Sequence, residues 1–214
     1  MRVGVVDLGT DSTRLLVADV EGRHVREVAR GTEITRLGEG VDERRKLLPL
    51  PVARVRNVLS DYRRELERLG AERVLAVGTS ALRDAENGEA FLGEIEWSYA
   101  FATRLLSGEE EAELTLRGVT DGRGLENGTL VLDVGGGSTE LITRDRAVSL
   151  DIGSVRLTEL FGEDIDAIAE YIRPLLPGFE PTAAVGVAGT ATSPTPRSVN
   201  AASSSPLSSC VVNP

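Results

Sequence analysis

Short apolar runs alternate along most of the chain with longer stretches in which apolar side chains recur at helical spacing. A short apolar run bounded by polar turns indicates a buried strand, whereas apolar positions roughly three or four apart indicate one face of a helix. In the first half we expect strands near residues 3–7, 15–19, 25–31, 74–77 and 104–106, and helices near 52–69, 89–97 and 109–119. The order is therefore three strands, followed by helices and strands in alternation.

The second half repeats this order after a polar, glycine-rich stretch at residues 121–128, which we interpret as the link between two domains. Strands are expected near residues 130–134, 140–143, 148–152 and 183–187, and helices near 154–161 and 165–176. Because both halves begin with three strands and then a helix, the pattern predicts two α/β units with mixed sheets. We place the first domain at residues 1–120 and a partial second domain at residues 121–192.

The character of the chain changes at residue 193. Serine and proline dominate residues 193–214, and Arg197 is the sole charged side chain there. Such a segment cannot bury enough apolar surface to offset the entropy of ordering it. We therefore expect this tail to be disordered or foreign to the fold. We also expect the second domain to be truncated, without counterparts of the helix and strand that follow Arg83.

Composition narrows the class of protein further. The 214 residues carry a formal net charge of −10, which disfavours the backbone of nucleic acid as a partner. Cys210 is the only cysteine and His24 the only histidine, so an internal disulfide and a cysteine-rich zinc site are excluded. No apolar run is long enough to cross a bilayer, and the N-terminus enters a strand at once. We expect a cytoplasmic protein without a membrane partner.

Two glycine loops carry the candidate chemistry. The first is VGVVDLGTDST, centred on Asp7, Gly9 and Thr10, and the second is LVLDVGGGSTEL, centred on Asp133 and residues 135–139. Glycines let backbone N–H groups approach phosphate oxygens, hydroxyls add donors, and a carboxylate can anchor Mg²⁺. Either loop alone is equally typical of a plain β-turn.

A second repeated signal favours the phosphate interpretation. RVLAVGTSALR follows the first loop and AVGVAGTAT follows the second, and both are apolar runs that lead into Gly-Thr. Two signals in the same order indicate two structurally related halves. We therefore expect the loops to face each other across a cleft and to clamp a phosphoanhydride there.

Six segments together resemble the exopolyphosphatase and guanosine pentaphosphate phosphohydrolase family. They are VDLGTDST, VGTSALRDA, SGEEEAELTLRGV, LDVGGGSTEL, SLDIGSVRLTE and VAGTAT, and they run in the family's order from Val3 to about Thr192. The resemblance implies the actin, Hsp70 and sugar-kinase superfold. It thus implies two ribonuclease-H-like α/β domains with mixed sheets flanking a cleft. It also implies that the protein could form a homodimer.

The resemblance implies a role for particular side chains. Glu111, directly before the alanine of SGEEEA, matches the family's catalytic base, and Arg83 matches its arginine near the scissile phosphate. Asp133 and Glu140 match the Mg²⁺-binding positions, with Asp7 as a further cation contact. The residues expected to bind phosphate are Gly9, Thr10, Ser12, Gly135, Gly136, Gly137, Ser138 and Thr139.

The residues themselves leave alternatives open. Three consecutive glutamates also favour a helix N-terminus through the helix dipole, and Arg83 could simply pair with Asp84 or Glu86. The chain departs from the family at Asp11, where asparagine is usual, and in its shortened second domain.

Three functions are compatible with these sequence features. The leading one is a Mg²⁺-dependent phosphohydrolase that removes the terminal phosphate of inorganic polyphosphate or guanosine pentaphosphate. The second is a module that binds polyphosphate or guanosine tetra- or pentaphosphate without turnover. The third is a phosphotransferase of the sugar-kinase type, for which no base-recognition residues follow Gly189 and Thr190.

Overall fold

The computed structural model of the chain describes residues 1–187 and 210–212. The chain forms two compact units, Met1–Ser107 and Gly108–Pro214, and each is described by itself. None of the helices in the described part combines the length and the apolar character that crossing a membrane requires.

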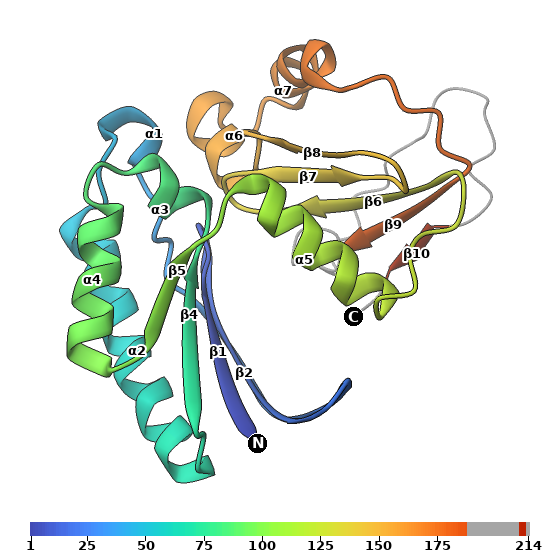
Figure 1. Cartoon of the computed structure of the whole chain (residues 1–214). Helices are drawn as coiled ribbons and strands as arrows, with labels where there is room; N and C mark the ends of the chain where they lie inside the picture. The colour runs from blue at the N-terminus through green and yellow to red at the C-terminus, as the bar shows by residue number, and fades with distance from the viewer. Residues whose placement is uncertain (188–209, 213–214) are drawn as a thin grey trace. The chain divides into compact units, whose positions relative to one another are not determined.

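The first unit is built on a mixed five-stranded sheet with the order β3-β2-β1-β4-β5 (Figure 1). Its strands are β1 (Arg2–Leu8), β2 (Ser12–Glu21), β3 (His24–Ile34), β4 (Arg73–Gly78) and β5 (Ala102–Leu105). The first three strands form an antiparallel meander, and β4 and β5 continue the sheet parallel to β1. Its helices are α1 (Val41–Arg44), α2 (Pro49–Leu69), α3 (Ser80–Asp84) and α4 (Gly88–Tyr99).

Helix α2 is the main helix of this unit. It begins at Pro49, earlier than the expected start at residue 52, because proline is tolerated in the first helical turn, where N–H groups have no partner within the helix. It ends as expected at Leu69, and the cap residue Gly70 has a φ of 71°, which suits glycine. Its apolar face, which includes Val55, Leu59 and Leu66, lies in the same core as the inward residues of the sheet.

The second unit has the same strand pairing. Its elements are α5 (Gly108–Thr120), β6 (Thr129–Val134), β7 (Thr139–Ile142), β8 (Ala147–Leu150), α6 (Ser154–Phe161), α7 (Ile165–Ile172), the 3₁₀ helix η1 (Arg173–Leu175), β9 (Ala183–Val187) and β10 (Cys210–Val212). The sheet order is β10-β9-β6-β7-β8, with β6, β7 and β8 antiparallel and β9 and β10 parallel to β6. Strands β6–β10 thus correspond to β1–β5, which confirms the prediction of two related α/β units.

Helix α5 belongs to the second unit, although we expected the first domain to include it and to end at residue 120. Figure 1 shows α5 along one face of the second sheet, where Ala112 is fully buried in a small core with Val131 and Ile142. This packing depends on contacts between distant residues, which helical periodicity does not reveal. The polar stretch at residues 121–128 therefore connects α5 to β6 within one unit, and our interpretation of it as an interdomain link is wrong.

Part of the serine- and proline-rich tail differs from expectation. Residues 210–212 form β10, which pairs in parallel with β9 and occupies the position that β5 has in the first sheet. The second unit therefore has a counterpart of the strand that we expected it to lack. A physical reason is that Cys210, Val211 and Val212 form a short apolar run of the kind that suits an edge strand. The expectations for residues 193–209 and 213–214 lie outside the described residues.

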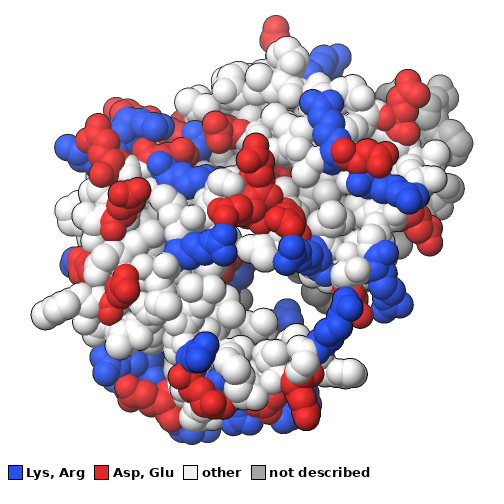
Figure 2. All heavy atoms as spheres, in the orientation of Figure 1, with Lys and Arg blue, Asp and Glu red and all other residues white. Residues whose placement is uncertain are grey.

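Acidic and basic side chains are mixed over the surface. Figure 2 shows Lys and Arg side chains interspersed with Asp and Glu on the face in view. Several form ion pairs along α2, including Arg63–Glu67 and Arg68–Glu65. Pairs this exposed each contribute at most about 1 kcal/mol to stability, so the buried apolar face dominates the packing of this helix.

Candidate active site

The two glycine loops adopt the same turn, one in each unit. The N–H of Gly9 donates to the carbonyl of Ser12 at 3.0 Å, and the N–H of Gly135 donates to the carbonyl of Ser138 at 3.0 Å. A Cβ added at Gly9 or Gly135 would lie 2.9 or 3.1 Å from the same carbonyl oxygen. A side chain would thus force a shift at Gly9 and would be tight at Gly135, and the two turns match down to individual hydrogen bonds.

The first loop is anchored by the segment that follows β3. The carbonyl of Asp11 accepts from the N–H groups of Thr35 and Arg36, and the carbonyl of Thr10 accepts from Gly38 at 2.8 Å. The side chains of Thr10 and Ser12 are both buried. The loop thus has a fixed backbone, which is what a cradle of N–H donors requires.

Arg83 lies in the first unit, on α3, which follows β4. Strands β1 and β4 are parallel and their ends are paired, with Leu8 beside Gly78, so the first glycine loop and the start of α3 follow the same edge of the sheet. One guanidinium nitrogen of Arg83 donates to the carbonyl of Leu106 at 2.8 Å. Its two alternative partners have contacts elsewhere: Asp84 accepts a 3.4 Å hydrogen bond from Ser80, and Glu86 lies 3.5 Å from Lys46.

The second loop is anchored by the N-terminus of α6. The carbonyls of Gly135 and Gly136 accept from backbone N–H groups of residues 154–156, and the carbonyl of Gly137 accepts from the Arg156 guanidinium at 2.9 Å. Gly153 makes this approach possible, because a Cβ there would lie 2.4 Å from the carbonyl oxygen of Gly136. With its carbonyls held by α6, the glycine backbone has a defined orientation.

The hydroxyls of the second loop have partners within their own unit. Thr139 donates to the carbonyl of Ile152, and Ser138 hydrogen-bonds the carboxyl group of Glu140. Both side chains are buried. Because both hydroxyls already have partners, we expect backbone N–H groups rather than these side chains to bind phosphate at this loop.

A row of polar side chains crosses the second sheet directly beside the loop. Asp133 on β6 is paired with Glu140 on β7, and Glu140 is paired with Ser149 on β8. Directly paired residues project from the same face of a sheet. Glu140 is only 1% exposed, and Ser149 donates to its Oε1 atom at 2.8 Å. Thr115 on α5 donates to Oδ2 of Asp133, also at 2.8 Å.

The charge of Glu111 acts on the same row of side chains. Burial, the charge of Glu111 and the charge of Asp133 raise the pKa of Glu140, whereas hydrogen bonds from Ser149 and Ser138 lower it, and the pKa is about 7. We call Glu111, Asp133 and Glu140 the acidic cluster of the second unit, because the charges of Glu111 and Asp133 both act on Glu140.

The two loops differ in charge at corresponding positions. In the first unit Arg14 pairs with Asp7 across the strands, and its guanidinium lies 3.7 Å from the Asp7 carboxylate. In the second unit the residue paired with Asp133 is Glu140. The first aspartate therefore lies beside a cation and the second beside another acid. Of the two loops, the second has the stronger electrostatic reason to attract a divalent cation.

The acidic cluster fits Mg²⁺ bound partly by substrate. Carboxylate oxygens are ligands that Mg²⁺ prefers, and Mg²⁺ is often held by one or two carboxylates, with phosphate and water completing its octahedron. In the described part of the chain no group of three or more acidic, histidine or cysteine side chains lies close enough to enclose a metal ion unaided. A Mg²⁺ ion at Asp133 and Glu140, the positions that the family resemblance implies, would therefore need phosphate oxygens or water as further ligands.

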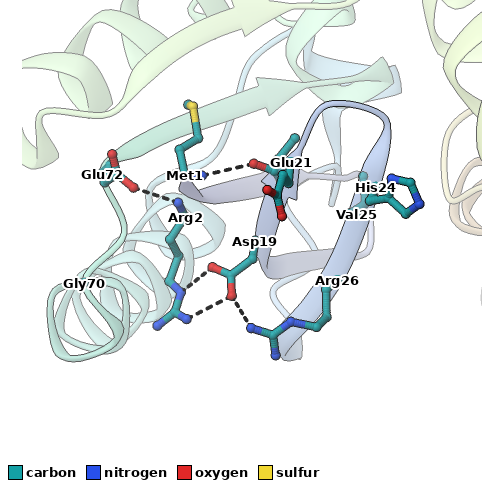
Figure 3. Close-up of a pocket in the computed structure, with 10 residues that line it drawn as sticks. Met1, Arg2, Asp19, Glu21, His24, Val25, Arg26, Gly70 and Glu72 are labelled. Atoms are coloured by element: carbon teal, nitrogen blue, oxygen red, sulfur yellow. Dashed lines mark hydrogen bonds and ion pairs between the residues drawn. The ribbon is translucent and has the colours of Figure 1, made fainter.

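A cavity of about 870 Å³ lies at the other end of β1 from the glycine loop (Figure 3). The side chain of Asp19 there accepts hydrogen bonds from both Arg2 and Arg26. Arg2 bonds additionally to the carbonyl of Leu69. Because Asp19 compensates the two arginines locally, this cavity does not resemble an anion site and is separate from the predicted chemistry.

Sequence reasoning missed residues that support the cluster, namely Thr115, Ser149, Gly153 and Arg156. A signal existed for Thr115, which lies four residues after Glu111 on a helix and hence on the same face. The structure places Glu111, Asp133, Glu140 and residues 135–139 in the second unit. It places Asp7, Gly9, Thr10, Ser12 and Arg83 in the first. That the two loops converge on one phosphoanhydride stays a prediction.

Comparison with known proteins identifies relatives. A model of the Ppx/GppA phosphatase family matches residues 16–173. Exopolyphosphatase 2 of Mycobacterium tuberculosis is 41% identical over 172 residues, which cover 74% of this chain and 54% of that protein. A guanosine-5′-triphosphate,3′-diphosphate pyrophosphatase of Vibrio vulnificus is 32% identical over 182 residues, which cover 83% of this chain and 37% of that protein. The chain thus spans about half or less of the length of these curated relatives.

The fold agrees with these matches. The crystal structure of an exopolyphosphatase from Cytophaga hutchinsonii superposes on this chain with a TM-score of 0.77 at 26% sequence identity. The superposed region covers 89% of this chain and 68% of the exopolyphosphatase. This similarity confirms the expected actin-like architecture of α/β units with mixed sheets. Since the family match covers well over half of the residues, the chain belongs to the Ppx/GppA phosphatase family.

Proposed function

We propose that the chain is the catalytic part of a Mg²⁺-dependent phosphohydrolase that removes the terminal phosphate of inorganic polyphosphate or guanosine pentaphosphate. Relatives named for each activity support this substrate class. Both substrates end in a phosphoanhydride, which the same loops could bind. The observation that carries the proposal is the acidic cluster of Glu111, Asp133 and Glu140 beside a glycine loop in one unit.

Each part of the cluster has a separate task in this mechanism. The Glu111 carboxylate orients a water molecule and accepts its proton as the water oxygen bonds to the terminal phosphorus. The bridging P–O bond breaks, which releases orthophosphate and a chain shorter by one phosphate. Asp133 and Glu140 would hold Mg²⁺, and the ion would supply positive charge that neutralises the phosphate oxygens.

The remaining predicted residues bind the substrate. The N–H groups of Gly136 and Gly137 bind phosphate oxygens, as does the N–H group of Thr10, whereas those of Gly9 and Gly135 already donate within their own turns and shape the loops. The planar guanidinium of Arg83 neutralises charge that develops in the transition state. The family resemblance and the loop geometry support these proposed roles.

The direct test is phosphate release from polyphosphate and from guanosine pentaphosphate, each with Mg²⁺ and with excess chelator. We expect release that requires Mg²⁺ and falls strongly in Asp133→Asn. Release at the same rate in the chelator would contradict the metal requirement. Release from one substrate alone would identify the substrate.

A binding module without turnover is the second candidate. In this candidate the glycine loops bind phosphate and Glu111 has no catalytic task. This candidate predicts a calorimetric signal on mixing the chain with polyphosphate and Mg²⁺, without release of phosphate over the same period. Release that follows binding would exclude it.

A further inference from the structure

We propose that Thr115 is a positioning residue that holds the Asp133 carboxylate in the orientation that receives the cation and links it to the helix that carries Glu111. This inference rests on the proposed function, because it assigns a role toward the same cation. Thr115 lies within the segment SGEEEAELTLRGV, in which the family resemblance assigns a role to Glu111 alone.

The contact itself is short and directed. The hydroxyl of Thr115 donates to Oδ2 of Asp133 at 2.8 Å, which is a normal length for a hydroxyl bonded to a carboxylate oxygen. An ionised carboxylate has two oxygens, so Asp133 can accept this bond through Oδ2 and still present Oδ1 to a cation. The bond thereby selects one rotamer of Asp133 before any cation arrives.

Asp133 needs such a restraint because of its neighbour. Glu140 is paired with it across the strands, and like charges directly opposite each other repel. When both carboxylates are ionised, this repulsion favours turning the Asp133 side chain away from Glu140, and the hydrogen bond from Thr115 opposes that rotation. Thr115 donates to Asp133 as Ser149 donates to Glu140, so each carboxylate of the pair is held by a hydroxyl.

The same bond relates the helix to the strand. Thr115 lies four residues after Glu111, and residues at this spacing share one face of a helix, about 6 Å apart along its axis. Fully buried Ala112 places this face against the sheet. A hydrogen bond from Thr115 to β6 therefore limits rotation of α5, and so fixes the proposed base relative to the proposed metal ligand.

A second threonine of α5 shows that this contact is not the default behaviour of threonine in a helix. Thr120 donates to the carbonyl of Leu116 in the preceding turn at 2.8 Å, the common backbone contact of a helical threonine. Thr115 instead donates across to another element. Thr120→Val is thus a matched control on the same helix, since it removes a hydroxyl without touching the acidic cluster.

The test measures cation affinity of the full chain, with Mn²⁺ as a spectroscopic probe. Free Mn²⁺ is titrated by electron paramagnetic resonance, and Mg²⁺ is titrated by calorimetry, for the wild type, Thr115→Val, Thr115→Ser, Thr120→Val and Asp133→Asn. We expect Thr115→Val to weaken affinity about tenfold, as for loss of one hydrogen bond to a charged group. Thr115→Ser and Thr120→Val should stay within about twofold of the wild type.

The outcomes separate this inference from the proposed function. Unchanged affinity in Asp133→Asn would overturn the metal site itself. Weak binding in Asp133→Asn with unchanged binding in Thr115→Val would overturn only the positioning role. Equal losses in Thr115→Val and Thr115→Ser would also overturn it, because the hydroxyl would then not be the cause. Thr115→Ala is measured in parallel, with thermal melts, so that a misfolded valine variant does not decide the result.

Discussion

Glu140 is the residue whose protonation depends most clearly on its surroundings. Burial is the largest cause that raises its pKa, followed by the charge of Glu111, and the pKa of about 7 compares with an ordinary value of 4.5. The folded state therefore binds this proton more tightly than the unfolded state does. The resulting contribution to stability is complete below pH 4.5 and is lost as the pH rises through about 7.

This leads to a prediction for the metal-free protein. Between pH 4.5 and about 7, in a chelator, the free energy of unfolding of the wild type should fall relative to that of Glu140→Gln, whose side chain does not titrate. The difference should reach the order of 3 kcal/mol. Urea unfolding followed by circular dichroism across this range measures it. Parallel curves for the two proteins would show that Glu140 has an ordinary pKa.

Gly153 is a second residue with a specific structural requirement. Its φ of −149° is open to any residue, so conformation is not the constraint. A Cβ there would lie 2.4 Å from a backbone oxygen of the glycine loop, which cannot move aside as a flexible side chain could. We expect Gly153→Ala to destabilise the second unit by about 2 kcal/mol, in the range of overpacking.

Gly118 supplies the control for this change. A Cβ added there meets nothing within 4 Å, and Gly118 lies inside α5. Gly118→Ala should therefore stabilise the protein by about 0.5–1 kcal/mol. Thermal melts compare the two variants. A Gly153→Ala melting temperature equal to the wild type would mean that the loop is not held closely against the turn before α6.

At the scale of elements, substitutions on the two faces of α2 compare how much a buried and an exposed leucine contribute to stability. Leu59 is fully buried in the core of the first unit, whereas Leu50 on the same helix is 64% exposed. We expect Leu59→Ala to cost about 2–5 kcal/mol and Leu50→Ala less than about 0.5 kcal/mol. Denaturant unfolding distinguishes them. Similar losses in both variants would contradict the assigned core face of α2.

The sequence predicted the long elements well, for a clear physical reason. Strands β1, β4, β6 and β9 are dense apolar runs, and α2 shows an apolar face over several turns, so the local pattern is strong enough to reveal these elements. Helices α1 and α3 were not predicted, since four and five residues are too few to show a period. The unit in which α5 packs and the strand with which β10 pairs both depend on contacts with residues distant in sequence, so the local pattern did not predict them.

The candidate site was predictable where the chemistry is local in sequence. Asp133, Glu140 and the glycines between them lie in one motif, and the structure shows their turn and pairing. The helical spacing from Glu111 pointed to the face that carries Thr115, but its bond to Asp133 depends on helix packing, and the contact of Ser149 depends on the register between β7 and β8. The contrast between Arg14 and Glu140 likewise appears only when the two turns are compared residue by residue.

At the scale of the whole molecule, one strand order occurs twice with different chemistry. Both sheets place a glycine turn after their first strand, yet the first has Arg14 beside its aspartate and the second has Glu140. The two units therefore have glycine turns of similar backbone, and the charged residue beside each aspartate makes the electrostatics of the two turns different. The second unit holds the proposed base and both proposed metal ligands, so the central claim concerns Glu111.

The most direct measurement of that claim is the initial rate of phosphate release from polyphosphate with Mg²⁺ for the wild type, Glu111→Gln and Glu109→Gln. Glu109 lies in the same first turn of α5 but is exposed, and it serves as the matched control. The account predicts a loss of about 10²–10⁴-fold in Glu111→Gln, as for removal of a general base, and little change in Glu109→Gln. Equal rates in Glu111→Gln and the wild type would contradict it.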